Sequence, residues 1–327
     1  MKVSDYIAEY LVSKNVTTVF GYIGGAITHL VDSIEKNKNI QFIQVYHEQT
    51  AAIAAEGVSR VSQAAGVAIA TSGPGATNLI TGIADAYFDS IPTVFITGQV
   101  NTFEYKYEKP IRQQGFQETD IVAIVKPVTK YAVLVEDPAQ IGYELDKAFH
   151  IATSGRPGPV LIDIPMNVQR AEISTTSLKR YIDPIPPCEG PLDIEDVVIT
   201  LRAAKRPLLL LGGGVLSAGA QELVASLVKK YHFPVVVSLM GKGAVSEDTT
   251  EFVGMLGSYG NRCANLALAT VDVLLALGTR LDTRQTGTMY KEFVKNGIII
   301  HVDIDQHELT HHRVQRQIQK QGDVKHF

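Results

Sequence analysis

The sequence predicts an α/β protein with two doubly wound parallel-sheet domains. Its 327 residues are 45% hydrophobic and 20% charged, which suits a globular chain of two domains. Short apolar runs alternate with helical patterns in both halves, as is typical of a parallel sheet covered by helices. A stretch rich in proline and serine predicts a linker at residues 171–190. We therefore expect domains at residues 1–170 and 191–327.

The first domain is predicted to begin with a helix. Tyr6, Ile7, Tyr10 and Leu11 follow helical spacing, and Ser4 precedes them as an N-cap. Apolar runs then predict strands, and helical patterns follow two of them. The strands are expected at residues 40–46, 66–73, 92–98 and 158–165, with helices beginning near Thr50 and Ala76.

The second domain repeats this alternation. Nearly continuous runs of Leu, Ile and Val predict strands buried on both faces, at residues 206–214, 233–239, 271–278 and 297–305. A helix is expected over residues 218–230. The tail at residues 311–327 carries a local basic run and predicts a solvent-exposed helix face. The first loop of the domain reads GGGVLSAGA, and it lacks the third glycine and the downstream acid of a nicotinamide-dinucleotide fingerprint.

Charge and cysteine content exclude several classes of function. The net charge is −4, from 30 basic and 34 acidic residues, so nucleic acid is not an expected partner. No apolar run approaches the ~18 residues that span a bilayer, so no membrane role is expected. Cys188 and Cys263 lie far apart without metal-ligand spacing, which predicts no zinc site and favours the reducing cytoplasm.

Four loops of the first domain follow strands and are candidates for ligand binding, because ligands of open parallel sheets bind beyond the carboxyl ends of the strands. They are residues 21–26, 47–49, 71–78 and 97–100. In the third loop, Gly73 and Gly75 allow close approach of a ligand, and Pro74 fixes its own φ. No Walker lysine follows, so a plain strand-to-helix turn is the alternative.

Glu48 is the candidate catalytic carboxylate. As a structural residue it would interact with a helix N-terminus, which is worth roughly 0.3–1 kcal/mol. A carboxylate at the end of a strand, facing a crevice lined by Gly24, Gly25, Pro74 and Asn78, would instead be partly desolvated. Glu48 is then a candidate proton shuttle.

Several segments resemble one family in content and in order. They read VFGYIGGA, HEQTAAIAAEG, TSGPGATNLITGIADAYFDSIPTVFITGQV, FQETDIVAIVKPVTKY, RPGPVLIDIP, GMLGSYGNRCANLAL and LGTRLDTRQTG. Together they resemble the thiamine-diphosphate-dependent 2-oxo acid enzymes, and most closely the acetolactate (acetohydroxyacid) synthase branch. The resemblance extends over essentially the whole chain. It implies a pyrimidine-binding domain followed by a Rossmann-like central domain.

The resemblance implies a role for Glu48. In this family the glutamate at the end of the strand hydrogen-bonds the aminopyrimidine ring and favours the imino tautomer, which removes the C2 proton of the thiazolium. The cofactor then decarboxylates pyruvate and transfers the two-carbon unit to a second carbonyl compound. Glu48 and Gln117 match the catalytic positions. Gly25, Ala26, Thr71, Pro74, Asn78 and Phe116 match residues around the cofactor.

In the synthase branch the central domain holds FAD, and several segments of the second half resemble the flavin contacts. They are Gly212, Gly213, Gly214, Ser238, Leu239, Met240, Gly257, Tyr259, Gly278, Arg280, Asp282, Arg284, Asp303, Ile304 and Asp323. The guanidinium groups of Arg280 and Arg284 suit a pyrophosphate. Arginines on a surface loop are the alternative interpretation.

The resemblance further implies a homodimer or homotetramer, Mg²⁺, and branched-chain amino acid biosynthesis. In the family a C-terminal domain holds Mg²⁺ and the cofactor diphosphate, and nothing after Asp323 resembles it, so we expect a fragment that is inactive alone. Two departures leave the acceptor substrate open: the segment 101–115 is longer than in the synthases, and Met166 replaces their usual lysine. The alternatives are a 2-oxo acid decarboxylase, a C–C hydrolase, and a non-catalytic flavin-binding or regulatory protein.

Overall fold

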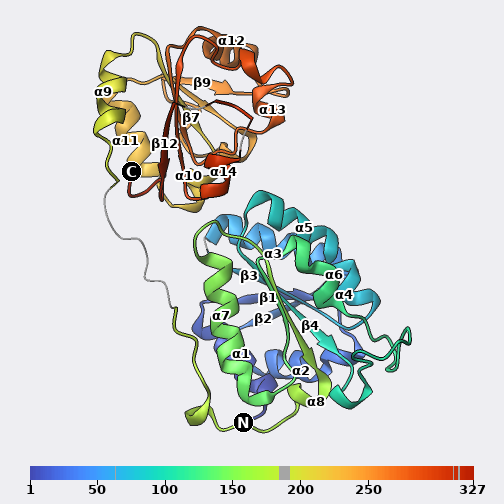
Figure 1. Cartoon of the computed structure of the whole chain (residues 1–327). Coiled ribbons are helices and arrows are strands. Elements are labelled where there is room, and N and C mark those ends of the chain that lie inside the picture. Colours follow the sequence, from blue (N-terminus) through green and yellow to red (C-terminus); the bar gives the residue numbers. More distant parts are fainter. Residues whose placement is uncertain (63, 184–191, 312, 316) are drawn as a thin grey trace. The chain divides into compact units, whose positions relative to one another are not determined.

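The computed structural model describes the chain except residues 63, 184–191, 312 and 316 (Figure 1). It divides into two compact units, Met1–Pro186 and Pro187–Phe327. Each unit contains one six-stranded sheet, and every strand pair is parallel. The predicted fold class, two α/β units with parallel sheets, is confirmed.

The sheet of the first unit has the strand order β2-β1-β3-β4-β6-β5. Its strands are β1 (Thr18–Gly21), β2 (Gln41–Gln44), β3 (Gly66–Ala70), β4 (Thr93–Gln99), β5 (Tyr131–Leu134) and β6 (Val160–Pro165). The central strands β3, β4 and β6 are buried along their whole length, as their apolar runs require. The run at residues 40–46 is different, because β2 lies at the sheet edge and is mostly exposed.

Helices cover both faces of this sheet (Figure 1). One core cluster joins the strands to α1, α2 and α7, and a second joins them to α3, α5 and α6. The α-helices of the unit are α1 (Val3–Ser13), α2 (Thr28–Lys36), α3 (Glu48–Ser62), α4 (Pro74–Asn78), α5 (Ile80–Asp89), α6 (Ile121–Val125), α7 (Ile141–Thr153) and α8 (Met166–Gln169). Short 3₁₀ turns are η1 (Gly25–Ile27), η2 (Thr102–Glu104), η3 (Lys126–Val128), η4 (Pro138–Gln140) and η5 (Thr175–Ser177).

The N-cap predicted for the first helix is wrong. The N-cap is Lys2, and Ser4 lies inside α1 as a fully buried residue. The hydroxyl of Ser33 donates a hydrogen bond to the Ser4 hydroxyl over 2.8 Å. Ser4 therefore fastens α1 to α2, because a buried hydroxyl needs a hydrogen-bond partner.

Part of the predicted linker at residues 171–190 lies along the first unit. The backbone N–H of Val3 donates to the carbonyl of Ala171, and Arg180 forms an ion pair with Asp146 at 2.5 Å. Residues 184–190 of that predicted linker, with Cys188, lie outside the described residues.

The sheet of the second unit has the order β12-β11-β10-β7-β8-β9. Its strands are β7 (Pro207–Leu211), β8 (Val235–Val237), β9 (Phe252–Met255), β10 (Val273–Leu277), β11 (Ile298–Asp303) and β12 (Ile318–Gln321). The helices are α9 (Glu195–Ala203), α10 (Gly213–Ser217), α11 (Gln221–Tyr231), α12 (Arg262–Thr270), α13 (Thr283–Thr286) and α14 (Gln306–Thr310), with 3₁₀ turns η6 (Leu239–Gly241) and η7 (Tyr290–Glu292). Two core clusters, one on each face, show that this sheet is also covered on both sides.

The prediction of a helix for the tail is wrong. Residues Ile318–Gln321 form the edge strand β12, which pairs in parallel with β11. Its residues alternate between partly exposed and exposed, which is the pattern of an edge strand. Within the described part of the chain, no helix combines the length and the apolar character needed to cross a bilayer.

Candidate functional site

The candidate site of the first unit lies where the strand order reverses. β1 and β3 are neighbours, while β2 pairs on the other side of β1, so the loops after β1 and β3 leave the sheet side by side. The backbone N–H of Ala26 donates to Thr71 Oγ1 over 3.1 Å. A Cβ on Gly24 would lie 2.4 Å from Thr71 Cβ, so only glycine fits there. The structure thus brings Gly25, Ala26 and Thr71 together.

Glu48 occupies the same end of the sheet. It is the first residue of α3, just after β2, and is 6% exposed. The amide Nδ2 of Asn78 donates to Glu48 Oε2 over 2.9 Å. A Cβ on Gly75 would lie 3.0 Å from Glu48 Oε1, so the first turn of α4, which begins at Pro74, runs directly beside the carboxylate. The predicted residues Glu48, Pro74 and Asn78 are therefore neighbours.

At the start of α3, it is the side chain of His47 that accepts a backbone hydrogen bond. Its Nδ1 accepts the backbone N–H of Gln49 over 3.2 Å, and its side chain is exposed. Among the described residues, the carboxylate of Glu48 makes its one hydrogen bond with Asn78 and forms no ion pair. This buried carboxylate is therefore held from one side, by the amide of Asn78.

Gln117 and Phe116 lie on the loop that follows β4. Gln117 has a φ of +59°, a left-handed conformation that costs a non-glycine residue roughly 1–3 kcal/mol. A Cβ on Gly73 would lie 2.9 Å from the Cβ of Gln117, so these two loops touch. Phe116 is 85% exposed. The catalytic candidates Glu48 and Gln117 thus lie at the same glycine-containing turn, Glu48 beside Gly75 and Gln117 beside Gly73.

Sequence analysis missed a buried polar network behind this loop. Thr97 Oγ1 donates to Asp163 Oδ1 over 2.7 Å, and Gln99 Nε2 donates to Asp163 Oδ2 over 2.8 Å. Gln99 Nε2 also donates to the carbonyl of Thr119 over 2.8 Å, which ties the loop to β4 and β6. Burial raises the pKa of Asp163 to about 7, against the lowering effect of its hydrogen bonds. The signal in the sequence was a single aspartate inside the apolar run VLIDIP.

In the second unit the strand order reverses between β7 and β10. The N–H of Gly214 donates to the carbonyl of Gly278 over 2.9 Å, and a Cβ on Gly212 would lie 2.0 Å from that carbonyl oxygen. A Cβ on Gly213 would lie 3.2 Å from Met240 Cβ. The structure therefore brings together the predicted flavin residues after β7, β8 and β10, namely Gly212, Gly213, Gly214, Ser238, Leu239, Met240 and Gly278.

A second group of predicted flavin residues gathers around Arg284. Its guanidinium Nη1 donates to the hydroxyl of Tyr259 over 2.7 Å, and its Cζ lies 5.1 Å from the centre of that ring. A Cβ on Gly257 would lie 2.6 Å from the carbonyl oxygen of Arg284. Asp282 caps α13, and Arg280 lies 3.7 Å from it.

The last predicted flavin residues follow the two outer strands of this sheet. The N–H of Gly322 donates to the carbonyl of Asp303 over 3.0 Å, so Asp303 at the end of β11 and Ile304 after it lie near Asp323, which follows β12. The predicted flavin residues therefore lie at or beyond the carboxyl ends of strands, in loops or in the first turns that follow them.

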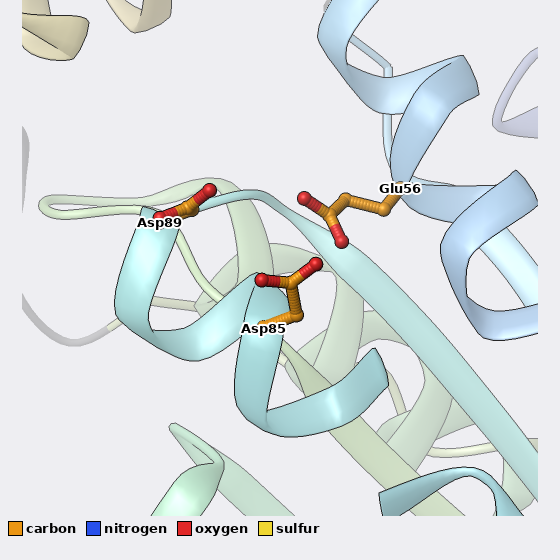
Figure 2. A group of neighbouring side chains, drawn as sticks. All are labelled: Glu56, Asp85 and Asp89. Carbon is orange, nitrogen blue, oxygen red and sulfur yellow. The ribbon is translucent and has the colours of Figure 1, made fainter. Parts of the chain in front are cut away.

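Figure 2 shows three acidic side chains between α3 and α5, with Glu56 and Asp85 directed toward one another. Candidate ligand atoms of Glu56, Asp85 and Asp89 lie within 4.8 Å of one another. Arg60 already neutralises much of this charge, because its Nη2 lies 2.5 Å from Glu56 Oε1 and 2.6 Å from Asp89 Oδ2. Burial raises the pKa of Glu56. We assign the group a structural role, which is to fasten the helix that carries Glu48.

Replacing Arg60 by Met is expected to lower the free energy of unfolding of the first unit by about 2–3 kcal/mol. The Glu56 side chain is 4% exposed and would lose its counter-ion, while the 35% exposure of Arg60 keeps the loss below that of a fully buried pair. Urea unfolding measures the difference. Arg170→Met, at an exposed position of the same unit, is the control and should change little. Equal stability of the two variants would contradict this role.

Two family models match this chain, one in each of its two units. Residues 1–124 match the family described as thiamine pyrophosphate enzyme, N-terminal TPP binding domain. Residues 194–327 match thiamine pyrophosphate enzyme, central domain. The first match includes the loops around Glu48, and the second includes the glycines after β7 and β10.

Individual relatives agree with these matches. An acetolactate synthase large subunit from Cyanidium caldarium is 41% identical over 318 residues, covering 94% of this chain and 53% of the relative. A probable acetolactate synthase large subunit from Methanocaldococcus jannaschii is 41% identical, covering 94% of this chain and 52% of its own length. The acetolactate synthase isozyme 3 large subunit from Escherichia coli is 38% identical, covering 92% of this chain and 52% of the relative.

The chain spans about half the length of these relatives. It belongs to the thiamine pyrophosphate enzymes and carries the N-terminal TPP binding domain and the central domain of that family.

Proposed function

We propose that this chain provides the pyrimidine-binding half of the cofactor site in a 2-oxo acid carboligase of the acetolactate synthase type. The observation that carries the proposal is Glu48, a 6% exposed carboxylate held by Asn78 where the strand order reverses. The names of the relatives support the same reaction. On this proposal the substrate is pyruvate and the pathway is branched-chain amino acid biosynthesis.

The residues present fit thiamine diphosphate. Nothing lies within 4 Å of a Cβ placed on Gly25, so the loop after β1 has open space on its ligand side. When bound, thiamine diphosphate supplies the carbon nucleophile for decarboxylation and carboligation. Glu48 holds a proton at the aminopyrimidine ring, and Asn78 fixes the direction of its carboxylate. Gln117, which packs against Gly73, and its neighbour Phe116 would orient the substrate.

We extend the proposal to Mg²⁺ and to assembly. Mg²⁺ would be held together with the cofactor diphosphate by groups other than the site residues described above, and the complete site would form between two subunits of a homodimer or homotetramer. Size-exclusion chromatography with light scattering, with and without thiamine diphosphate and Mg²⁺, tests the assembly. A complete gene product that is active as a monomer would contradict it.

We also propose that the second unit binds FAD as a structural group. Its strand order reverses between β7 and β10, where Gly214 meets Gly278, and dinucleotides bind at such points. Flavin is expected to remain bound through purification and to be released by denaturation. Arg284→Met should weaken flavin binding about 10-fold or more, whereas Arg202→Met, on an exposed position of α9, should not. Purified protein without visible flavin absorbance would contradict this part of the proposal.

The reaction is tested on the complete gene product that contains this chain. With pyruvate, thiamine diphosphate and Mg²⁺, we expect release of carbon dioxide and formation of acetolactate. Acetaldehyde as the main product would favour a decarboxylase on the same scaffold. Tight flavin binding without any turnover of 2-oxo acids would favour a non-catalytic role.

A further inference from the structure

The loop that carries Phe116 and Gln117 contains a buried carboxylate with an unusual set of partners. Glu118 is 5% exposed. Its Oε1 accepts the backbone N–H of Lys106 over 2.8 Å. Its Oε2 accepts the N–H groups of Gln114 and Gly115 over 2.8 Å and 3.0 Å. A single side chain therefore satisfies three backbone donors of one loop, and it joins residue 106 to residue 118.

This carboxylate keeps its charge over a wide pH range. Burial by itself would raise the pKa of Glu118, but the donated N–H groups of Gln114, Lys106 and Gly115 outweigh burial and hold the pKa below its ordinary range. The cation Lys106 adds to this lowering of the Glu118 pKa. Because the bonds to a charged acceptor are stronger than those to a neutral one, the loop is fixed at neutral pH.

Gln117 stands next to this fixed point. Its left-handed backbone, with φ of +59°, persists only where its surroundings impose it. The bonds from Glu118 to Gln114 and Gly115 fix the chain before Gln117, and the bond from Gln99 Nε2 to the carbonyl of Thr119 fixes it two residues after Gln117. The glycine at position 73 leaves the room into which Gln117 fits, since a Cβ there would lie 2.9 Å from its Cβ.

We propose that Glu118 is a positioning residue, whose carboxylate folds residues 106–118 into a rigid platform that holds Gln117 against Gly73 beside the cofactor site. The structural part of this inference stands on the contacts of Glu118 alone. Its catalytic consequence rests on the proposed function. The two parts need separate measurements, which can fail independently.

The structural part is tested on the chain itself by limited proteolysis with trypsin. The loop contains two tryptic cleavage sites, Lys106 and Arg112, of which Arg112 is exposed, whereas Pro110 blocks cleavage after Lys109. Glu118→Gln places an amide N–H group against a backbone N–H group and removes the charge, so cleavage within the loop should become at least 10-fold faster. Glu108→Gln, at an exposed position of the same loop, is the matched control. Unchanged cleavage of Glu118→Gln would overturn the inference.

A second variant and a spectroscopic probe distinguish loosening of this loop from unfolding of the whole unit. The protein contains no tryptophan, so Phe116→Trp places a single reporter on the platform. Its fluorescence anisotropy should fall in the Glu118→Gln background, while circular dichroism stays unchanged. Glu118→Asp keeps the charge with a shorter reach and should restore part of the anisotropy. No recovery with Asp, or loss of circular dichroism in both variants, would overturn a specific role of the carboxylate.

The catalytic part is tested on the complete gene product. Glu118→Gln should lower kcat at least 10-fold and leave the Kd of thiamine diphosphate within about 2-fold, because the platform faces the substrate. Combining it with Gln117→Ala should add little to the loss caused by Gln117→Ala alone. Fully additive losses would overturn the positioning role. A wild-type protein without any carboligase activity would instead refute the proposed function and leave the proteolysis result standing.

Discussion

Replacing Glu48 by Gln in the complete gene product is expected to slow carbon dioxide release from pyruvate by a factor of about 10²–10⁴. Glutamine has nearly the same shape, and its amide oxygen can still accept the hydrogen bond that Asn78 donates over 2.9 Å. It cannot hold or release a proton at the pyrimidine ring. The loss should therefore fall on kcat, with thiamine diphosphate binding weakened far less.

Two controls separate this loss from damage to the fold. Glu9→Gln changes the same residue type at an exposed position on α1 and should keep full activity. Urea unfolding should show the same stability for Glu48→Gln and the wild-type protein within about 1 kcal/mol, because the bond to Asn78 is retained. An active Glu48→Gln variant would show that another group handles the proton.

Replacing Asp163 by Asn is expected to change how the stability of the first unit depends on pH. Burial raises the pKa of Asp163 to about 7 in the folded protein, whereas an unfolded chain has an ordinary aspartate. The folded state therefore binds more protons between about pH 4 and pH 7, and stability must fall as pH rises through that range. The fall attributable to this one group is up to about 4 kcal/mol.

Asparagine removes the titration and keeps the shape. Its amide can donate to Thr97 Oγ1 and accept from Gln99 Nε2, which now donate to the carboxyl over 2.7 Å and 2.8 Å. Urea unfolding of the chain from about pH 4 to about pH 7 should show a marked decline for wild type and a much flatter profile for Asp163→Asn. Asp248→Asn, at an exposed position, should follow wild type. Parallel profiles for wild type and Asp163→Asn would refute the account of this buried carboxyl.

Most of the fold could be predicted because long apolar runs mark most of the central strands. β3, β4, β6, β7 and β10 are buried along nearly their whole length, and a continuous run of Ile, Leu and Val leaves few alternatives. The strands that were missed are β1, β5, β9 and β12, which have four residues each and include partly exposed positions. Strands this short do not show enough of the two-residue alternation to be distinguished from loops or helix ends.

The candidate site was predictable only in part, for a different reason. Glu48 and the glycines at positions 73 and 75 stand in loops after strands, and a parallel sheet gathers such loops at one edge. Glu118 and Gln99 act through backbone groups that lie up to 20 residues away in the sequence. No local pattern encodes a contact with a backbone N–H or carbonyl of a folded loop, so these residues became visible only in the structure.

The central claim is that the carboxylate of Glu48 activates bound thiamine diphosphate. The most direct test measures how fast the C2 proton of the cofactor exchanges with deuterium in the complete gene product, by quenched-flow NMR. We predict rapid exchange in the wild-type protein and, in Glu48→Gln with cofactor bound, exchange no faster than in free cofactor. Rapid exchange in the cofactor-loaded Glu48→Gln variant would contradict the claim.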